Sequence, residues 1–138
     1  MPSNGTLPKR ASSGTINASS RFHDYSERLK PEKELVVFRI IQELINNILK
    51  HSNSSFIHLT QNVHGDKFYL RIHHDGRGIV QSDFEKLNKS NIGLGLKNIS
   101  SRLRVVHGEI NFEKDISQTY YKITLELPKD DPYDGWPF

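Results

Sequence analysis

The feature that most limits what this chain can fold into is a long helical segment that starts at Pro31. The proline is followed by EKELVVFRIIQELINNILKHS, which carries acidic residues in its first turn and Lys50 and His51 in its last. Proline at the first helical position, acids near the positive N-terminus and cations near the negative C-terminus are typical of an α-helix. Because apolar residues wrap around most of its circumference, we expect this helix to be largely buried.

A stripe of polar residues runs along this apolar helix. Its members recur every three or four positions and therefore share one face: Arg39, Glu43, Asn47 and Lys50. A buried carboxylate or amide without a partner costs about 1–3 kcal/mol, so the stripe must face water or a ligand. Taken alone, a solvated helix face is the commoner explanation.

The rest of the chain alternates between strand and helix patterns. SFIHLTQNV and KFYLRIHH alternate apolar and polar residues around a Gly65-Asp66 turn, which predicts a hairpin. Apolar residues at three- and four-residue spacing from Leu96 to Val106, followed by Gly108, predict a second helix. EINFEK and YYKITLEL predict a second hairpin. We therefore expect an α+β two-layer sandwich with helices on one sheet face.

The length of 138 residues gives room for one domain, which we expect to span 16–128. Residues 1–15 are rich in Pro, Gly, Ser and Thr, so we expect a linker or an expression remnant there. Residues 129–138 contain two prolines and are expected to form a C-terminal tail.

Composition excludes several classes of function. The net charge is +3 and the basic residues are scattered, which argues against a nucleic-acid partner. The chain has no cysteine and no histidines at zinc-ligand spacing, so we expect neither a disulfide framework nor structural zinc. Apolar runs are too short to span a bilayer and no secretory signal is visible, so we expect a cytoplasmic domain without membrane contact, whose parent protein could still be membrane-anchored.

Two glycine motifs flank the predicted strands and the second helix. In HHDGRGI, which follows a strand, Asp75 precedes Gly76 and Gly78, and a simple turn would explain this motif equally well. In NIGLGLKNI, Gly93 and Gly95 stand before a helix, where backbone N–H groups favour phosphate. The second motif is neither a Walker P-loop nor a dinucleotide fingerprint. Each motif is weak on its own.

The order of three segments is more specific than any one of them. RIIQELINNILKHS, then DGRGI, then GLGLKNISSRL resembles the GHKL ATPase superfamily over roughly residues 31–128. Within it, the chain is most similar to the ATP-binding catalytic domains of sensor histidine kinases of the nitrate-sensor and desaturase-sensor type. The resemblance implies a Bergerat-type fold, with a mixed, mostly antiparallel sheet, and implies ATP and Mg²⁺ as cofactors.

The resemblance also implies a role for each matching residue in the first helix. Glu43 matches the catalytic acid that polarises the attacking group. Asn47 matches the amide that ligates the Mg²⁺ bridging the phosphates. Lys50 and His51 match the pair on the phosphate side. This helix would therefore carry the metal and phosphate contacts.

The glycine motifs match the two remaining sides of such a site. Asp75 would accept from the adenine amino group, while Gly76 and Gly78, followed by Ile79, would let the backbone approach the base. The second motif would shape the end of a lid, spanning 80–92, over the phosphates. Its ATP-binding residues would be Gly93, Leu94, Gly95 and Leu96.

The chain departs from the family pattern in its last hairpin. Where members usually carry Gly-Thr, this sequence has Tyr120 and Tyr121, with Thr119 two residues before the expected threonine position. The departure leaves open whether Tyr121 narrows the nucleotide pocket or points away from it.

The implied activity is transfer of the γ-phosphoryl group of ATP to a histidine. We expect that histidine on a dimerisation domain absent from this chain, with a response regulator as the downstream partner. Two alternatives remain open. One is an anti-sigma-factor-type serine protein kinase, which shares the three motifs, and the other is a non-catalytic nucleotide-sensing module.

Overall fold

The protein was studied as a computed structural model that describes residues 17–22, 29–89, 95–117 and 119–130. The strands of these residues form one sheet in the order β1-β2-β3-β5-β4, in which β1 is parallel to β2 and all other neighbours are antiparallel. Their bounds are Asn17–Phe22 for β1, Phe56–His64 for β2, Lys67–His74 for β3, Glu109–Asp115 for β4 and Tyr120–Pro128 for β5. Both predicted hairpins are confirmed.

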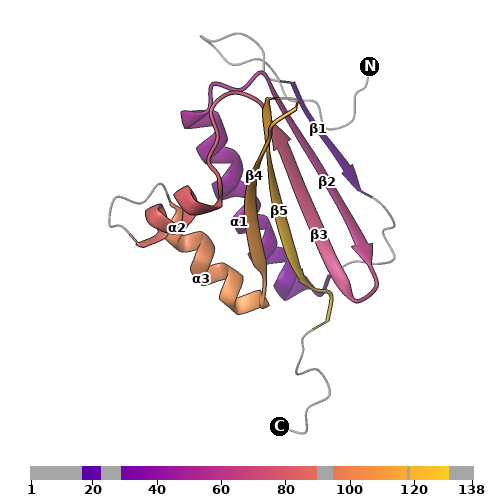
Figure 1. Ribbon diagram of the computed structural model, residues 1–138. Helices are drawn as coiled ribbons and strands as arrows, with labels where there is room; N and C mark the ends of the chain where they lie inside the picture. The colour runs from indigo at the N-terminus through magenta and orange to yellow at the C-terminus, as the bar shows by residue number, and fades with distance from the viewer. Residues whose placement is uncertain (1–16, 23–28, 90–94, 118, 131–138) are drawn as a thin grey trace, which may run out of the picture.

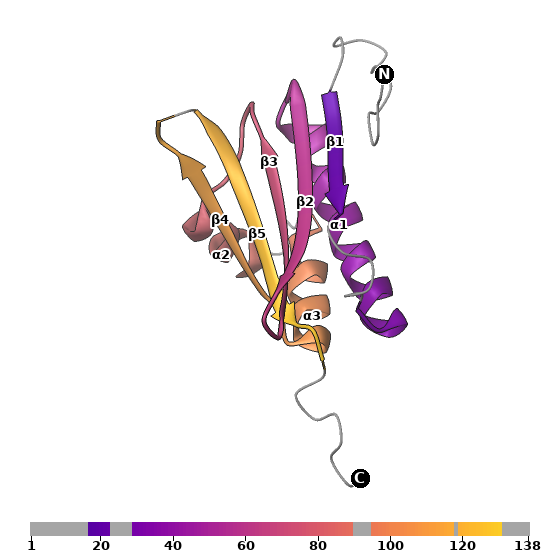
Figure 2. The same ribbon diagram turned by 90° about the vertical axis from the view of Figure 1, so that its right-hand side faces the viewer.

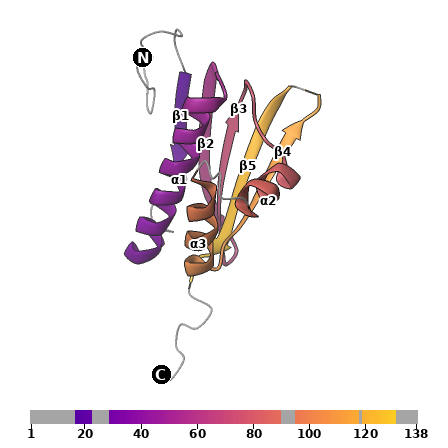
Figure 3. The same cartoon turned by 90° about the vertical axis from the view of Figure 1, so that its left-hand side faces the viewer.

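Helices cover one face of this sheet. They are α1 (Pro31–His51), α2 (Gln81–Lys89) and α3 (Leu96–Val106). Figures 1 and 3 show them on the same side of the strands, and Figure 2 shows the strands in front of them. The two-layer α+β architecture with a mixed, mostly antiparallel sheet is confirmed. None of the described helices combines the length and the apolar character that a membrane span requires.

Two elements were not predicted. β1 has the sequence NASSRF, which lacks alternating large apolar residues, and its pairing with β2 rests on backbone hydrogen bonds. α2 occupies most of the segment expected to be a lid. Its first turn is capped by Asp83, whose Oδ2 accepts from the Val80 N–H at 3.1 Å, and its Phe84 is buried. The linker expected over 1–15 lies outside the described residues, as does the tail from residue 131.

The core lies between the helices and the sheet. Its most deeply buried members include Ile40 and Leu44 of α1, Ile72 of β3 and Leu125 of β5. The expectation that α1 is largely buried is wrong, because the helix packs on a single layer and buries one face. On its outer side Leu35 and Phe38 are 58% and 53% exposed.

Candidate functional site

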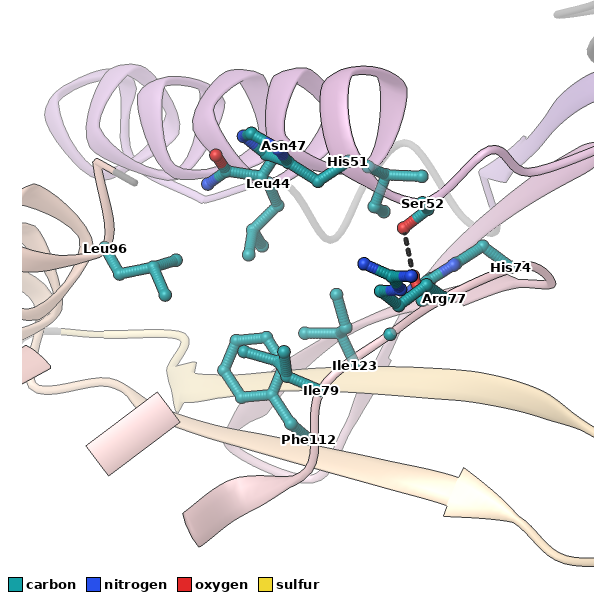
Figure 4. Close-up of a pocket in the computed structure, with 12 residues that line it drawn as sticks. Leu44, Asn47, His51, Ser52, His74, Arg77, Ile79, Leu96, Phe112 and Ile123 are labelled. Carbon is teal, nitrogen blue, oxygen red and sulfur yellow. Dashed lines mark hydrogen bonds between the residues drawn. The ribbon is translucent and has the colours of Figure 1, made fainter. Parts of the chain in front are cut away.

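A cavity of about 290 Å³ lies between α1 and the sheet, at the lower end of the usual range of about 300–1,000 Å³ for ligand pockets. Its apolar wall consists of Leu44, Ile48, Ile79, Leu96, Phe112 and Ile123. Its polar residues are Asn47, His51, Ser52, His74 and Arg77, joined by Gly78 (Figure 4). None of the described lining residues is acidic, so the cavity suits a ligand that combines an apolar part with negative charge.

The polar stripe of α1 reaches this cavity through Asn47, with His51 one turn further along. The Asn47 Nδ2 atom is buried and has no hydrogen-bond partner among the residues that the structure describes. Since a buried donor without a partner is costly, this amide is available for a ligand. Lys50 is exposed and does not line the cavity.

The first glycine turn is fastened to the end of α1. The Arg77 N–H donates to the Ser52 carbonyl at 2.8 Å, and the Ser52 hydroxyl donates back to the Arg77 carbonyl. Gly76 has a φ of +80°, and a Cβ at this position would come closer than 3.0 Å to the Ser52 carbonyl oxygen. Only glycine fits this turn while both hydrogen bonds are kept.

Asp75, for which the family resemblance implies an adenine contact, does not line the cavity. Its Oδ1 atom accepts from the backbone N–H groups of Ser55 at 2.7 Å and Phe56 at 3.1 Å, and its Oδ2 atom accepts from the Ser55 hydroxyl. Partial burial acts to raise the pKa of Asp75, but these hydrogen bonds outweigh it and hold the pKa below its usual value. The carboxylate therefore ties the first glycine turn to the start of β2.

The residue before Asp75, His74, was not predicted as a site residue, yet it lines the cavity and is 2% exposed. Burial lowers its pKa, against the opposing effect of Asp75, so the ring is neutral at neutral pH. Strand alternation could have identified it, because β3 buries every second residue from Phe68 onward and His74 continues that series.

Tyr121 packs beside His74 and does not line the cavity. The two residues are paired across β3 and β5, and their rings stack with centroids 5.7 Å apart and planes 16° apart. Gly78 makes room for the tyrosine, since a Cβ there would come closer than 3.0 Å to its ring. The tyrosine thus supports the histidine from the neighbouring strand, β5.

The second glycine motif meets the polar stripe. Gly95 caps the N-terminus of α3 with a φ of +83°, and a Cβ on it would overlap the Glu43 carboxylate. The half-buried Glu43 therefore lies against the start of α3, and Leu96 follows in the cavity wall. Gly93 and Leu94 lie outside the described residues.

The structure thus brings together part of the predicted site. The predicted residues that line the cavity are Asn47, His51, Gly78, Ile79 and Leu96. The lining residues that sequence reasoning missed are Leu44, Ile48, Ser52, His74, Arg77, Phe112 and Ile123. Most of the missed residues are apolar or follow strand alternation, so they resemble ordinary core positions in a sequence.

Known proteins share this sequence pattern. The family model described as histidine kinase-, DNA gyrase B-, and HSP90-like ATPase matches residues 32–131. The oxygen sensor histidine kinase NreB of Staphylococcus carnosus is 27% identical over 106 residues, which cover 77% of this chain and 29% of that protein. The signal transduction histidine-protein kinase/phosphatase DegS of Bacillus subtilis is 33% identical over 103 residues, 74% of this chain and 26% of that protein. The chain spans less than a third of either relative.

A solved structure shares the fold. The catalytic domain of the histidine kinase ThkA superposes with a TM-score of 0.67 at 18% identity, covering 83% of this chain and 79% of that domain. At this level of identity the similarity concerns the arrangement of helices and strands.

Proposed function

The chain belongs to the histidine kinase-, DNA gyrase B- and HSP90-like ATPase family, and from this membership we propose that it binds Mg²⁺-ATP in the cavity between α1 and the sheet. The observation that carries the proposal is the lining of that cavity. An apolar wall suits a flat base, while the unpartnered Asn47 amide, the Arg77 guanidinium and the absence of acids among the described lining residues suit a polyphosphate.

The polyphosphate belongs at the end of the cavity formed by α3. Gly95 and Leu96 start this helix, whose N-terminal N–H groups and dipole favour an anion. Asn47 fits a magnesium site, because an amide oxygen is a ligand that Mg²⁺ accepts beside phosphate oxygens. Its Nδ2 donor, which has no partner among the described residues, would bond a phosphate oxygen. Bound Mg²⁺ would neutralise charge on the phosphates.

We further propose that the domain serves as the catalytic part of a sensor histidine kinase, since two relatives that match about three quarters of it are named as histidine kinases. The phosphoryl group would pass to a histidine on a dimerisation domain, and from there to a response regulator. Glu43 would polarise the attacking histidine nitrogen, a role that its position against the start of α3 supports.

Titration calorimetry tests the binding. ATP should bind with Mg²⁺ and more weakly without it, and Asn47→Ala should remove most of the Mg²⁺-dependent gain. Asn46→Ala is the matched control, because the neighbouring Asn46 is exposed and does not line the cavity. Equal binding by the Asn47 variant and the wild type would show that the amide does not contact the metal. A wild-type domain that binds no ATP would refute the proposed function.

An assay of phosphoryl transfer must also contain the domain that carries the acceptor histidine. The domain, mixed with the dimerisation domain of its parent protein, γ-labelled ATP and Mg²⁺, should give an acid-labile label on a histidine, and Glu43→Gln should reduce the labelling rate while ATP still binds. A stable label on serine would instead support the serine-kinase alternative. No label, with ATP bound, would contradict the kinase assignment.

A further inference from the structure

Two histidines face each other on the side of the sheet away from the helices. His58 of β2 and His73 of β3 are directly opposite in the antiparallel register. Since Ile72 and His74 on either side of His73 are buried towards the helices, His73 lies on the open face, which is the face in front in Figure 2. The β2-β3 hairpin thus brings together two imidazoles that are far apart in the sequence.

The two rings are close enough to share a metal ion. Their centroids are 6.4 Å apart, and their planes are tilted by 45°. An imidazole nitrogen binds Zn²⁺ at about 2.0–2.1 Å, which places the ion about 3.2 Å from the ring centroid. Two rings that share an ion are therefore at most about 6.5 Å apart, and a small side-chain rotation would bring this pair well inside that limit.

One ring nitrogen of His73 has no partner. Its Nδ1 atom is buried and makes no hydrogen bond to any residue in the part of the chain that the structure describes. A buried polar atom in this state is costly to the fold and calls for a partner. A metal ion shared with His58 would supply that partner.

The charge state of His73 also suits a metal ligand. Burial, followed by the charges of Lys122, His58 and Arg71, lowers the pKa of His73, and the opposing effect of Asp115 is smaller. The imidazole is therefore neutral at neutral pH, which is the form that binds a metal ion.

The two neighbouring cations are held by other groups. The Lys122 ammonium lies 3.7 Å from the Glu113 carboxylate. Arg71 donates to the Asn62 side-chain carbonyl at 3.3 Å and lies over the Tyr69 ring. Neither contact involves a histidine ring, so both can persist when an ion is bound.

We propose that His58 and His73 together bind a divalent transition-metal ion, Cu²⁺ or Zn²⁺, on the open face of the sheet. Imidazole nitrogen is a ligand that suits both ions. Among the described residues no third histidine or carboxylate joins this pair, so water would occupy the remaining positions of the ion. The ion would join β2 to β3 on the face opposite the cavity, and this proposal does not depend on the binding of ATP.

Titration of the full chain with Cu²⁺, in the absence of nucleotide, tests the site. Calorimetry should show binding of the ion, and the electron paramagnetic resonance spectrum of the bound Cu²⁺ should show two imidazole nitrogens. Zn²⁺ should bind more weakly than Cu²⁺, as it does at nitrogen sites in general. His58→Asn and His73→Asn should each weaken Cu²⁺ binding by at least about tenfold and remove the two-nitrogen spectrum, because each removes one of two imidazoles.

His64→Asn is the matched control, because His64 is an exposed histidine on the same face of β2 and is opposite Lys67 instead of a histidine. This variant should bind Cu²⁺ as the wild type does. The wild-type spectrum needs no substitution, so it tests the site even if a variant fails to fold. A wild-type spectrum without two imidazole nitrogens, or wild-type affinity in both His58→Asn and His73→Asn, would overturn the proposal.

Discussion

Replacing Gly76 by alanine should destabilise the domain far more than the same change at Gly65. Both glycines have positive φ, +80° and +66°, so each alanine would be forced into the left-handed region at a cost of about 1–2 kcal/mol. A Cβ on Gly65 meets nothing within 4 Å, whereas a Cβ on Gly76 meets the Ser52 carbonyl oxygen at less than 3.0 Å. Because that neighbour is backbone, the turn itself would have to move.

Movement of the turn would break the two hydrogen bonds between Ser52 and Arg77. At about 1 kcal/mol each, their loss brings the expected cost of Gly76→Ala to about 3–4 kcal/mol, against about 1–2 kcal/mol for Gly65→Ala. Urea unfolding followed by circular dichroism measures both free energies. Equal losses of stability in the two variants would show that close packing against the Ser52 carbonyl does not explain why residue 76 is a glycine.

The two histidines that end β3 should make the domain less stable in mild acid. Burial, the leading cause in both, lowers the pKa of His73 and His74 below 6.5, so the unfolded chain binds more protons below that pH. The urea midpoint should therefore fall as the pH drops from about 7 to 5, and a constant midpoint would contradict this. Asn47→Ala should leave the free energy of unfolding within about 1 kcal/mol of wild type by urea titration, because the deleted Nδ2 donor has no partner among the described residues. Phe112→Ala should cost about 3–5 kcal/mol, seen as a lower melting temperature, because the ring is 4% exposed; Phe38→Ala, at a position 53% exposed, should cost much less.

The elements with strong local signals could be predicted from the sequence. Pro31 and the charges at both ends set the bounds of α1, and strand alternation predicted both hairpins. β1 was missed because its pairing with β2 is made by the backbone and leaves no apolar pattern. α2 was missed because Phe84 and Leu87 are too few apolar residues to establish a helical period.

The site was predicted in part for a similar reason. Asn47 and His51 could be placed because helical spacing relates them to the rest of the polar stripe. Asp75 was chosen because a carboxylate beside two glycines is the more conspicuous residue of its turn, but His74 and not Asp75 lines the cavity. Whether His74 or Asp75 faces the cavity depends on where the alternation of β3 ends. The alternation continues through His74, which places His74 on the buried face.

The strand order has a consequence for how the domain is made. β5 is the last described strand in the sequence, yet it lies inside the sheet, between β3 and β4. A chain still on the ribosome therefore lacks the partner of β3 until residues 120–128 have been synthesised, and the edge of β3 remains free to pair wrongly. The Lys33 ammonium donates to the Pro128 carbonyl at 2.9 Å and so joins the start of α1 to the end of β5. Completion of the described sheet thus waits for β5.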